Sequence, residues 1–198
     1  MTLPATGPRK GDRTRNSLIV AAIARFAREG FRGTSVADIC RDAGLSTTAS
    51  YPYFPNKEAL LVAAVDEDVA GLIYDAVSLV AITPDGHWGH TMMRGLIDRV
   101  PSHPLARRIL SGLEPDFTLR LLQIPALEQL RKDVAELVRS QQLTGTVRRD
   151  IEPGQMASGM VVIVISLLMA TMQTGGTGFE LVADDVEAVL DAATRPPK

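Results

Sequence analysis

Residues 34–60 constrain the fold of this chain more than any other stretch. Ser35, with Asp38 three residues later, has the pattern of a helix N-terminus capped by a serine side chain. The sequence Gly44-Leu45-Ser46 then ends that helix, because glycine readily adopts a left-handed backbone and serine can cap a following helix. Asn56 can cap a third, longer helix. Two short helices joined by a glycine-containing turn form a helix-turn-helix, an arrangement that reads DNA.

Apolar residues recur at helical spacing through most of the remaining chain. Leu18, Ala22 and Phe26 share one stripe of a helix that begins at Asp12 or Arg13 and ends at Gly30. Alternating Val and Ile segments are scarce and only 5% of the residues are aromatic, so the chain is expected to be all-α. The other expected helices cover about 35–42, 47–53, 56–77, 87–100, 104–111, 114–122, 125–143, 153–173 and 184–194.

The charge of the chain is unevenly distributed. Residues 1–60 contain nine Lys and Arg against five Asp and Glu, whereas residues 61–198 contain twelve against eighteen. A basic N-terminal part on an acidic body is expected if only the N-terminal part meets phosphates. The single cysteine, Cys40, cannot form an internal disulfide, which favours a reducing, cytoplasmic location.

Two segments bear on targeting and membranes. Residues 1–11 are polar and rich in Pro and Gly, without the apolar centre of a signal peptide, and are predicted to form a flexible arm. Met156–Met172 has seventeen residues without a charge, just short of a membrane span, and lacks flanking basic or aromatic anchors. We expect this segment to be a helix buried on all sides in a soluble protein, with no membrane partner.

Three stretches of the N-terminal part carry a family resemblance. They are Phe26-Ala27-Arg28-Glu29-Gly30-Phe31-Arg32-Gly33-Thr34-Ser35-Val36, the turn from Ile39 to Ser46, and Tyr51-Pro52-Tyr53-Phe54-Pro55-Asn56-Lys57-Glu58-Ala59-Leu60. In this order and spacing, residues 12–60 resemble the DNA-binding domain of TetR-family transcriptional regulators. The resemblance implies a three-helix helix-turn-helix domain at 12–60, joined by a long helix to a helical ligand-binding and dimerisation domain at 61–198.

The resemblance also implies which residues meet double-stranded DNA. A recognition helix reads base edges from its N-terminal part, while hydroxyls, lysines and helix N-termini contact phosphates. Tyr51, Tyr53 and Lys57 are the expected phosphate contacts, and Thr47, Thr48 and Ser50 the expected base contacts. The full set of expected DNA-binding residues is Thr34, Ser35, Ser46, Thr47, Thr48, Ala49, Ser50, Tyr51, Pro52, Tyr53 and Lys57.

This sequence departs from the family pattern inside the recognition helix. Members often have Lys-Gly at the positions of Thr47 and Thr48 and Leu at the position of Ser50. Pro52 stands where many members have His, Tyr or Trp. A proline cannot donate the helical hydrogen bond to residue 48, so the recognition helix is predicted to be kinked or tightened before its end.

The C-terminal part is expected to hold the effector site and the dimer interface. A ligand between its helices would need an apolar cavity with a few polar groups, although each candidate residue also fits a plain core position. A homodimer is expected through the last two helices, at about 153–173 and 184–194, because symmetric operators call for two-fold dimers. The candidate lining residues are Trp88, Met92, Met93, Leu96, Phe117, Leu121, Met160, Met169 and Gln173.

Together these features predict a cytoplasmic, homodimeric, ligand-responsive repressor that binds a palindromic operator and is released by a small apolar effector. An activator with the same DNA-binding part, or a helical interaction module, are the alternatives. No cofactor or metal is expected, since His87 and His90 share a helix face but no carboxylate pair completes a site. No nucleophile motif or phosphate-binding loop points to an enzyme.

Overall fold

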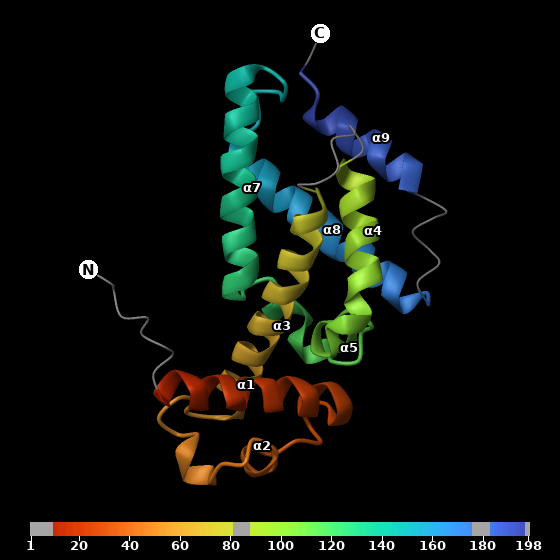
Figure 1. Cartoon of the computed structure of the whole chain (residues 1–198). Coiled ribbons are helices and arrows are strands. Elements are labelled where there is room, and N and C mark those ends of the chain that lie inside the picture. The colour runs from red at the N-terminus through yellow and green to blue at the C-terminus, as the bar shows by residue number, and fades with distance from the viewer. Residues whose placement is uncertain (1–9, 81–87, 176–182, 197–198) are drawn as a thin grey trace, which may run out of the picture.

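The computed structural model describes residues 10–80, 88–175 and 183–196, and every element in these ranges is helical. The chain divides into a small N-terminal head and a larger body (Figure 1). The head consists of α1 (Lys10–Glu29), α2 (Val36–Asp42) and the 3₁₀ turn η1 (Thr47–Ala49). The long helix α3 (Lys57–Val80) begins in the head and runs into the body. The predicted all-α class is confirmed.

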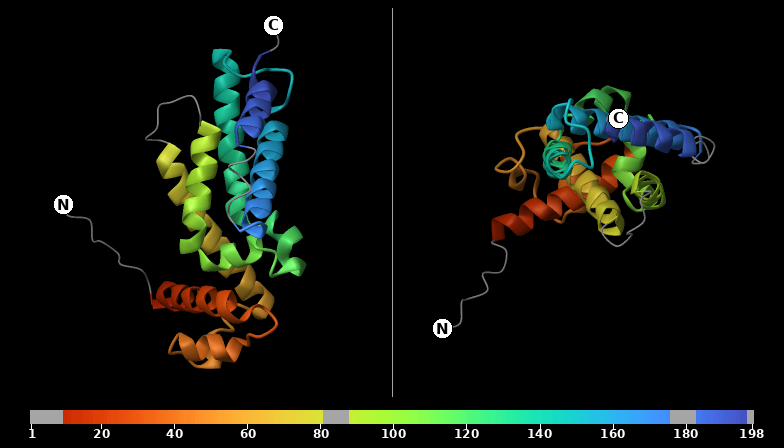
Figure 2. Two further views of the ribbon diagram at one scale, coloured as in Figure 1. Left: turned by 90° about the vertical axis from the view of Figure 1, so that its right-hand side faces the viewer. Right: turned by 90° about the horizontal axis from the view of Figure 1, so that it is seen from above.

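The body surrounds the upper part of α3 with helices (Figures 1 and 2). Nearly all of them begin and end within two residues of the predicted positions. Three of the starts are set by prolines, since Pro104, Pro125 and Pro153 each stand at the first position of a helix. The elements after α3 are α4 (Trp88–Arg99), η2 (Val100–Ser102), α5 (Pro104–Leu110), η3 (Pro115–Phe117), α6 (Thr118–Leu121), α7 (Pro125–Thr144), α8 (Pro153–Gln173) and α9 (Ala183–Thr194).

Helix α1 differs from its predicted start. It begins at Lys10, inside the segment expected to be a flexible arm, and residues 1–9 lie outside the described residues. Gly30 ends the helix with φ +74° and donates its amide to the Phe26 carbonyl at 2.9 Å. Leu18, Ala22 and Phe26 are fully buried, so the predicted stripe faces the core.

Two acidic residues of α3 fix the helices that follow it. The Asp68 carboxylate is buried and accepts the amides of Leu105 and Ala106, at 2.9 and 2.8 Å, at the start of α5. Asp66 accepts the Ala126 amide at 2.7 Å at the start of α7. These amides have no partner inside their own helices, so α3 supplies the N-terminal caps of α5 and α7.

Helix α8 is buried on one face only. Met156, Ala157, Val161, Leu168 and Thr171 are buried. Its opposite face is exposed, and of its most apolar 18-residue window, of mean hydropathy 1.9, only 28% is buried inside the subunit. The prediction of a helix buried on all sides is therefore wrong for a single subunit. The exposed face carries Ser158, Gly159, Val162, Ile163, Ser166 and Ala170.

By length and composition alone, α8 is also the one described helix that could cross a membrane. A core helix of a soluble protein passes the same test, and one face of α8 packs in the main core.

Candidate nucleic-acid interface

The turn between α2 and η1 has the backbone that its glycine predicts. Gly44 has φ +68°, and the Leu45 amide donates to the Cys40 carbonyl at 2.8 Å. Leu45 packs against the main core, while Ile39 and Cys40 of α2 are fully buried. The core therefore holds α2 and the following segment in a fixed relation, as a helix-turn-helix requires.

The recognition segment, residues 47–53, is not a regular α-helix. Thr47–Ala49 form a single 3₁₀ turn, and the chain continues as turns to Tyr53. Pro52 has no amide hydrogen to donate, and the amides of Tyr53 and Phe54 both donate to the Ser50 carbonyl at 3.0 Å. The predicted tightening before the end of the segment is confirmed, and the expected helix of about 47–53 is shorter than predicted.

The recognition segment lies at the end of the head farthest from the body (Figures 1 and 2). Ser46, Thr47, Thr48 and Pro52 are exposed, Tyr51 is 62% exposed and Ala49 is half-buried. Ser46 stands at the N-cap but makes no capping hydrogen bond; its hydroxyl lies 3.0 Å from that of Thr48. A surface of this kind can enter a groove without rearranging the core.

Two of the expected DNA-binding residues are buried. The Thr34 side chain is 3% exposed and its hydroxyl donates to the Gly30 carbonyl at 2.8 Å. Ser50 is fully buried and its hydroxyl donates to the Thr47 carbonyl at 2.8 Å. Both hydroxyls close local turns, so we leave these two residues out of the proposed interface.

Ser35 caps α2 as its spacing predicts. Its hydroxyl oxygen accepts the Asp38 amide at 3.2 Å, and the hydroxyl donates to the Asp38 carboxylate at 2.6 Å. This hydrogen bond, with Arg41 as a second neighbour, holds the pKa of the Asp38 carboxyl below its usual value. Ser35 remains exposed at the start of α2, where a helix N-terminus favours a phosphate.

Lys57 is engaged inside the head. Its ammonium donates to the carbonyls of Phe31 and Thr34, both at 3.0 Å, and lies 4.2 Å from the centre of the Phe31 ring. The side chain is half-buried. Two of its three N–H groups thus hold the connection between α1 and α2, a role that the sequence did not predict. Asn56, by contrast, caps α3 as predicted by accepting the Ala59 amide at 2.8 Å.

The two tyrosines of the segment occupy different environments. Tyr51 projects into solvent, whereas the Tyr53 ring packs against the main core. The Tyr53 hydroxyl lies beside Gly11, where an added Cβ would stand 3.4 Å from it. The exposed Tyr51 is therefore free to reach a phosphate as predicted, while the half-buried Tyr53 also has a packing role.

Ion pairs hold several head arginines. Arg25 of α1 lies 2.9 Å from Asp42 of α2 and is largely buried, so it links two helices. At the start of α1, Arg13 and Arg15 are exposed, and Arg15 lies 5.6 Å from the centre of the Phe54 ring. These two cations stand on the helix next to Tyr53 and can reach a flanking phosphate.

The head matches a known family. Residues 18–64 match the family model described as "Bacterial regulatory proteins, tetR family". The head is a TetR-family DNA-binding domain. The match spans most of α1, α2, the recognition segment and the first turns of α3, which are the elements described above. The family description supports DNA-binding regulation as the function of the head.

Solved structures extend the likeness beyond the TetR-family head to the body. The TetR-family regulator from Cytophaga hutchinsonii has 20% identity and a TM-score of 0.68, over 98% of this chain and 100% of that one. A TetR-family regulator from Pectobacterium atrosepticum has 18% identity and a TM-score of 0.69, over 96% and 98%. The fatty acid degradation regulator FadR from Bacillus halodurans has 15% identity and a TM-score of 0.66, over 94% and 96%. At these identities the likeness shows that the whole chain has the fold of TetR-family regulators.

The predicted effector residues do not all belong to one cluster. Met93, Leu96, Phe117 and Leu121 are buried in the main core, and Met92 and Met169 pack against it. Met160 packs instead against a separate cluster of Val138, Val147 and Met156. Gln173 is exposed and donates to the Leu110 carbonyl at 3.4 Å, and the side chain of Trp88 lies outside the described residues. The effector site stays a prediction.

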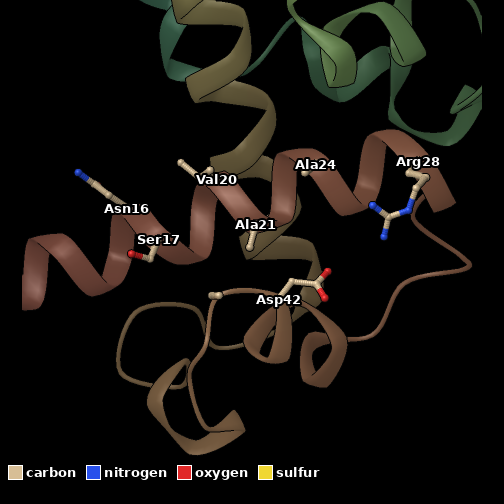
Figure 3. Close-up of a pocket in the computed structure, with 8 residues that line it drawn as sticks. Asn16, Ser17, Val20, Ala21, Ala24, Arg28 and Asp42 are labelled. Carbon is tan, nitrogen blue, oxygen red and sulfur yellow. The ribbon is translucent and has the colours of Figure 1, made fainter.

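An open depression lies on the TetR-family head rather than in the body (Figure 3). Its walls come from α1 and the end of α2, and one of its lining residues, Val20, is 66% exposed. Effector sites enclose most of a ligand, which an open surface of this kind does not do. The residues that line it are Asn16, Ser17, Val20, Ala21, Ala24, Arg28, Asp42 and Ala43.

Sequence reasoning missed the contacts that join head and body. Glu114, just after α5, accepts the Phe31 amide at 3.2 Å and the Arg108 Nε–H at 2.8 Å. Arg108 also donates to the Ala27 carbonyl at 3.4 Å near the end of α1. An exposed pair, Arg32 with Asp116, lies beside them at 3.1 Å. No local sequence pattern predicts these contacts, because the partners in the head and in the body, such as Phe31 and Glu114, are about eighty positions apart.

The histidines give no metal site within the described part of the chain. No group of three or more His, Cys, Asp or Glu side chains there is placed to hold a metal ion. His103 lies between two carboxylates, 3.4 Å from Asp68 and 3.3 Å from Asp75. His87 and the side chain of His90 lie outside the described residues.

Proposed function

We propose that this protein is a ligand-responsive transcriptional repressor that binds a palindromic operator as a homodimer. The observation that carries the proposal is the exposed recognition segment at the free end of a TetR-family head. Its base-reading residues are Thr47 and Thr48, and Tyr51 and Tyr53 contact phosphates beside them. The α2 N-terminus at Ser35 adds a backbone contact.

The proposal is tested by the binding of duplex DNA. Fragments from upstream of its own gene and of neighbouring genes are titrated at several salt concentrations, and a salt-sensitive, sequence-selective complex is expected. Tyr51→Ala should weaken the complex about 30-fold, from about 1 kcal/mol lost per subunit of the dimer. Tyr74→Ala is the matched control, because Tyr74 is 74% exposed on α3 in the body.

The outcome separates the proposal from a helical interaction module that no longer reads DNA. If no duplex is bound above the level of unrelated DNA, the regulator proposal fails. If Tyr51→Ala and Tyr74→Ala bind equally well, the proposed recognition segment is not the DNA-contacting surface. An activator would bind in the same way, so reporter expression with and without the protein decides between repression and activation.

Homodimerisation through α8 and α9 is part of the proposal. The exposed α8 face is uncharged and combines Val162 and Ile163 with the small residues Ser158 and Gly159, which allow another helix to approach closely. On α9, Val189 is 68% exposed. A second copy of the chain would cover both surfaces about a two-fold axis and place two heads on successive major grooves.

The dimer is tested by a charge in the centre of that face. Ile163→Asp should convert the dimer to a monomer in sedimentation equilibrium, because an unpaired carboxylate would be buried between subunits. Leu143→Asp is the control: Leu143 is 77% exposed at the end of α7, outside the proposed interface. Equal dimer dissociation constants for the two variants would exclude this interface.

Release by an effector is supported by the connection between body and head. Helix α5 is capped by Asp68 of α3 and reaches α1 through Arg108 and Glu114. A ligand that binds better to one arrangement of the body helices would therefore favour one placement of the head. The methionine-containing body favours an apolar or amphipathic effector, and one similar structure is described as a fatty acid degradation regulator.

A further inference from the structure

The recognition segment lacks the side chains that read bases most specifically. From Ala43 to Pro55 the chain contains no Lys, Arg, His, Asp, Glu, Asn or Gln. Asn56, the next residue, uses its side-chain oxygen to cap α3. Arginine and lysine read guanine, asparagine and glutamine read adenine, and carboxylates accept from cytosine. None of these contacts can come from residues 43–55.

The hydroxyls of the segment are poor at telling bases apart. Ser50 is fully buried and its hydroxyl donates to the Thr47 carbonyl. The hydroxyls of Ser46 and Thr48 lie 3.0 Å apart and can bond to each other. A hydroxyl can donate or accept, so it pairs with either kind of group on a base edge. These groups alone would give a weak preference.

Besides its hydroxyls, the exposed residues of the segment offer apolar groups. They are the methyls of Thr47 and Thr48, the ring of Tyr51 and the ring of Pro52. The 3₁₀ turn and the turns after it present these groups on one short segment of seven residues, 47–53. In the major groove, the one apolar group that distinguishes a base is the 5-methyl of thymine.

We propose that this segment selects its half-site through thymine 5-methyl groups, which the methyls of Thr47 and Thr48 and the rings of Tyr51 and Pro52 contact. This inference rests on the proposed DNA-binding function and says which DNA sequences the recognition segment selects. Operator half-sites bound by this protein are therefore rich in thymine where they face residues 47–52, and guanine contributes little there.

The first test removes methyl groups from the DNA. After selection of a bound operator from random duplexes, each thymine is replaced singly by uracil, which changes only the 5-methyl. Loss of one contacted methyl should weaken binding about fourfold, and the same change in both half-sites about 15-fold. Uracil at thymines outside the selected operator is the control and should change nothing.

The second test changes the protein at Thr48. Thr48→Val keeps the methyl and replaces the hydroxyl by a second methyl, whereas Thr48→Ser keeps the hydroxyl and loses the methyl. Methyl recognition predicts that Thr48→Val binds as the parent does and that Thr48→Ser binds about fourfold less tightly in each half-site. Thr48→Ser should also become insensitive to uracil at the contacted thymine, because the partner methyl is gone. The same pair of variants at Thr47 locates the second contact.

The outcomes separate this inference from the proposed function. If the selected operator is bound but no uracil substitution weakens it, the methyl inference is wrong and the regulator proposal stands. If Thr48→Val and Thr47→Val lose affinity while the serine variants keep it, recognition is by hydroxyls and the inference is wrong. If selection enriches no duplex at any salt concentration, the proposed function itself fails.

Discussion

Replacing Lys57 by methionine separates two roles for a cation at the start of α3. The structure places its ammonium on the carbonyls of Phe31 and Thr34, which it holds at 3.0 Å each. The family resemblance places the same residue on a DNA phosphate. Methionine keeps the unbranched apolar side chain and removes the charge and the donors, so Lys57→Met isolates what the ammonium does.

The expected loss of stability follows from the contacts. Each hydrogen bond from a charged donor contributes about 1.5–3 kcal/mol, and the contact with the Phe31 ring about 0.5–1 kcal/mol. Because the side chain is only half-buried, water replaces part of the lost donors, and we expect a net loss of about 2 kcal/mol. For a chain of this length, that lowers Tm by about 4–8 °C.

Two assays then distinguish the roles. Thermal unfolding followed by circular dichroism gives Tm, and DNA titrations at several salt concentrations give the slope of log K against log [salt]. If Lys57 contacts a phosphate in each subunit, its loss should make that negative slope less steep by about 2 units. An internal role leaves the slope unchanged while Tm falls. Lys132→Met is the control, because Lys132 is exposed on α7 and pairs only with Glu128 in the described structure.

The result that would refute the structural role is an unchanged Tm with a salt slope reduced by about 2 units. In that case the ammonium contributes nothing to the free α1–α2 connection and acts on DNA alone. A lower Tm together with a less steep slope would mean that the third N–H of Lys57 reaches a phosphate while the other two donate to the carbonyls.

Three further predictions concern the head and its connection to the body. Glu114→Ala removes the carboxylate that accepts the Phe31 amide and the part-buried Arg108 side chain, so the free energy of unfolding in urea titrations should fall by about 2 kcal/mol. An unchanged urea midpoint would mean that this contact does not stabilise the fold. Pro52→Ala should lengthen the short 3₁₀ turn into an α-helix, visible as new sequential amide NOEs, and should change which duplexes are selected; identical spectra would exclude proline as the cause of the turn. Because the hydrogen bond from Ser35 lowers the pKa of Asp38, this group stabilises the fold above the pKa of the unfolded carboxyl, near 3.9. That contribution is lost as the pH falls through the lower folded value, so Asp38→Asn should flatten the stability curve from about pH 5 downward.

Most of the fold could be predicted because its signals are local. Helix ends follow from caps and breakers that a reader of the sequence can recognise: Ser35, Gly44, Asn56 and Pro153 each stand at the end or the start that they predict. The apolar periodicity of α1 predicted its buried stripe because that signal is also local. These features depend on neighbours within four residues, so they survive without knowledge of the tertiary structure.

The candidate site was harder to predict because its contacts join distant residues. Nothing near Lys57 shows that its ammonium reaches carbonyls 23 and 26 positions earlier. The burial of Thr34 and Ser50 is likewise decided by the packing of the head rather than by their own spacing. At α8, composition predicted burial correctly for one face but could not show that the other face is left uncovered by the same subunit.

Sequence preference and salt-dependent affinity depend on two different segments of the head, residues 43–55 and the start of α1. Residues 43–55 carry no charge, so they can add shape and methyl contacts but little to salt-dependent binding. The cations at the start of α1, including the exposed Arg13 and Arg15, lie on a different helix and can add phosphate contacts without reading a base. Affinity and sequence preference are therefore separable in this protein: changes in α1 should alter the salt slope, and changes in 47–52 should alter the preferred half-site while the slope stays constant.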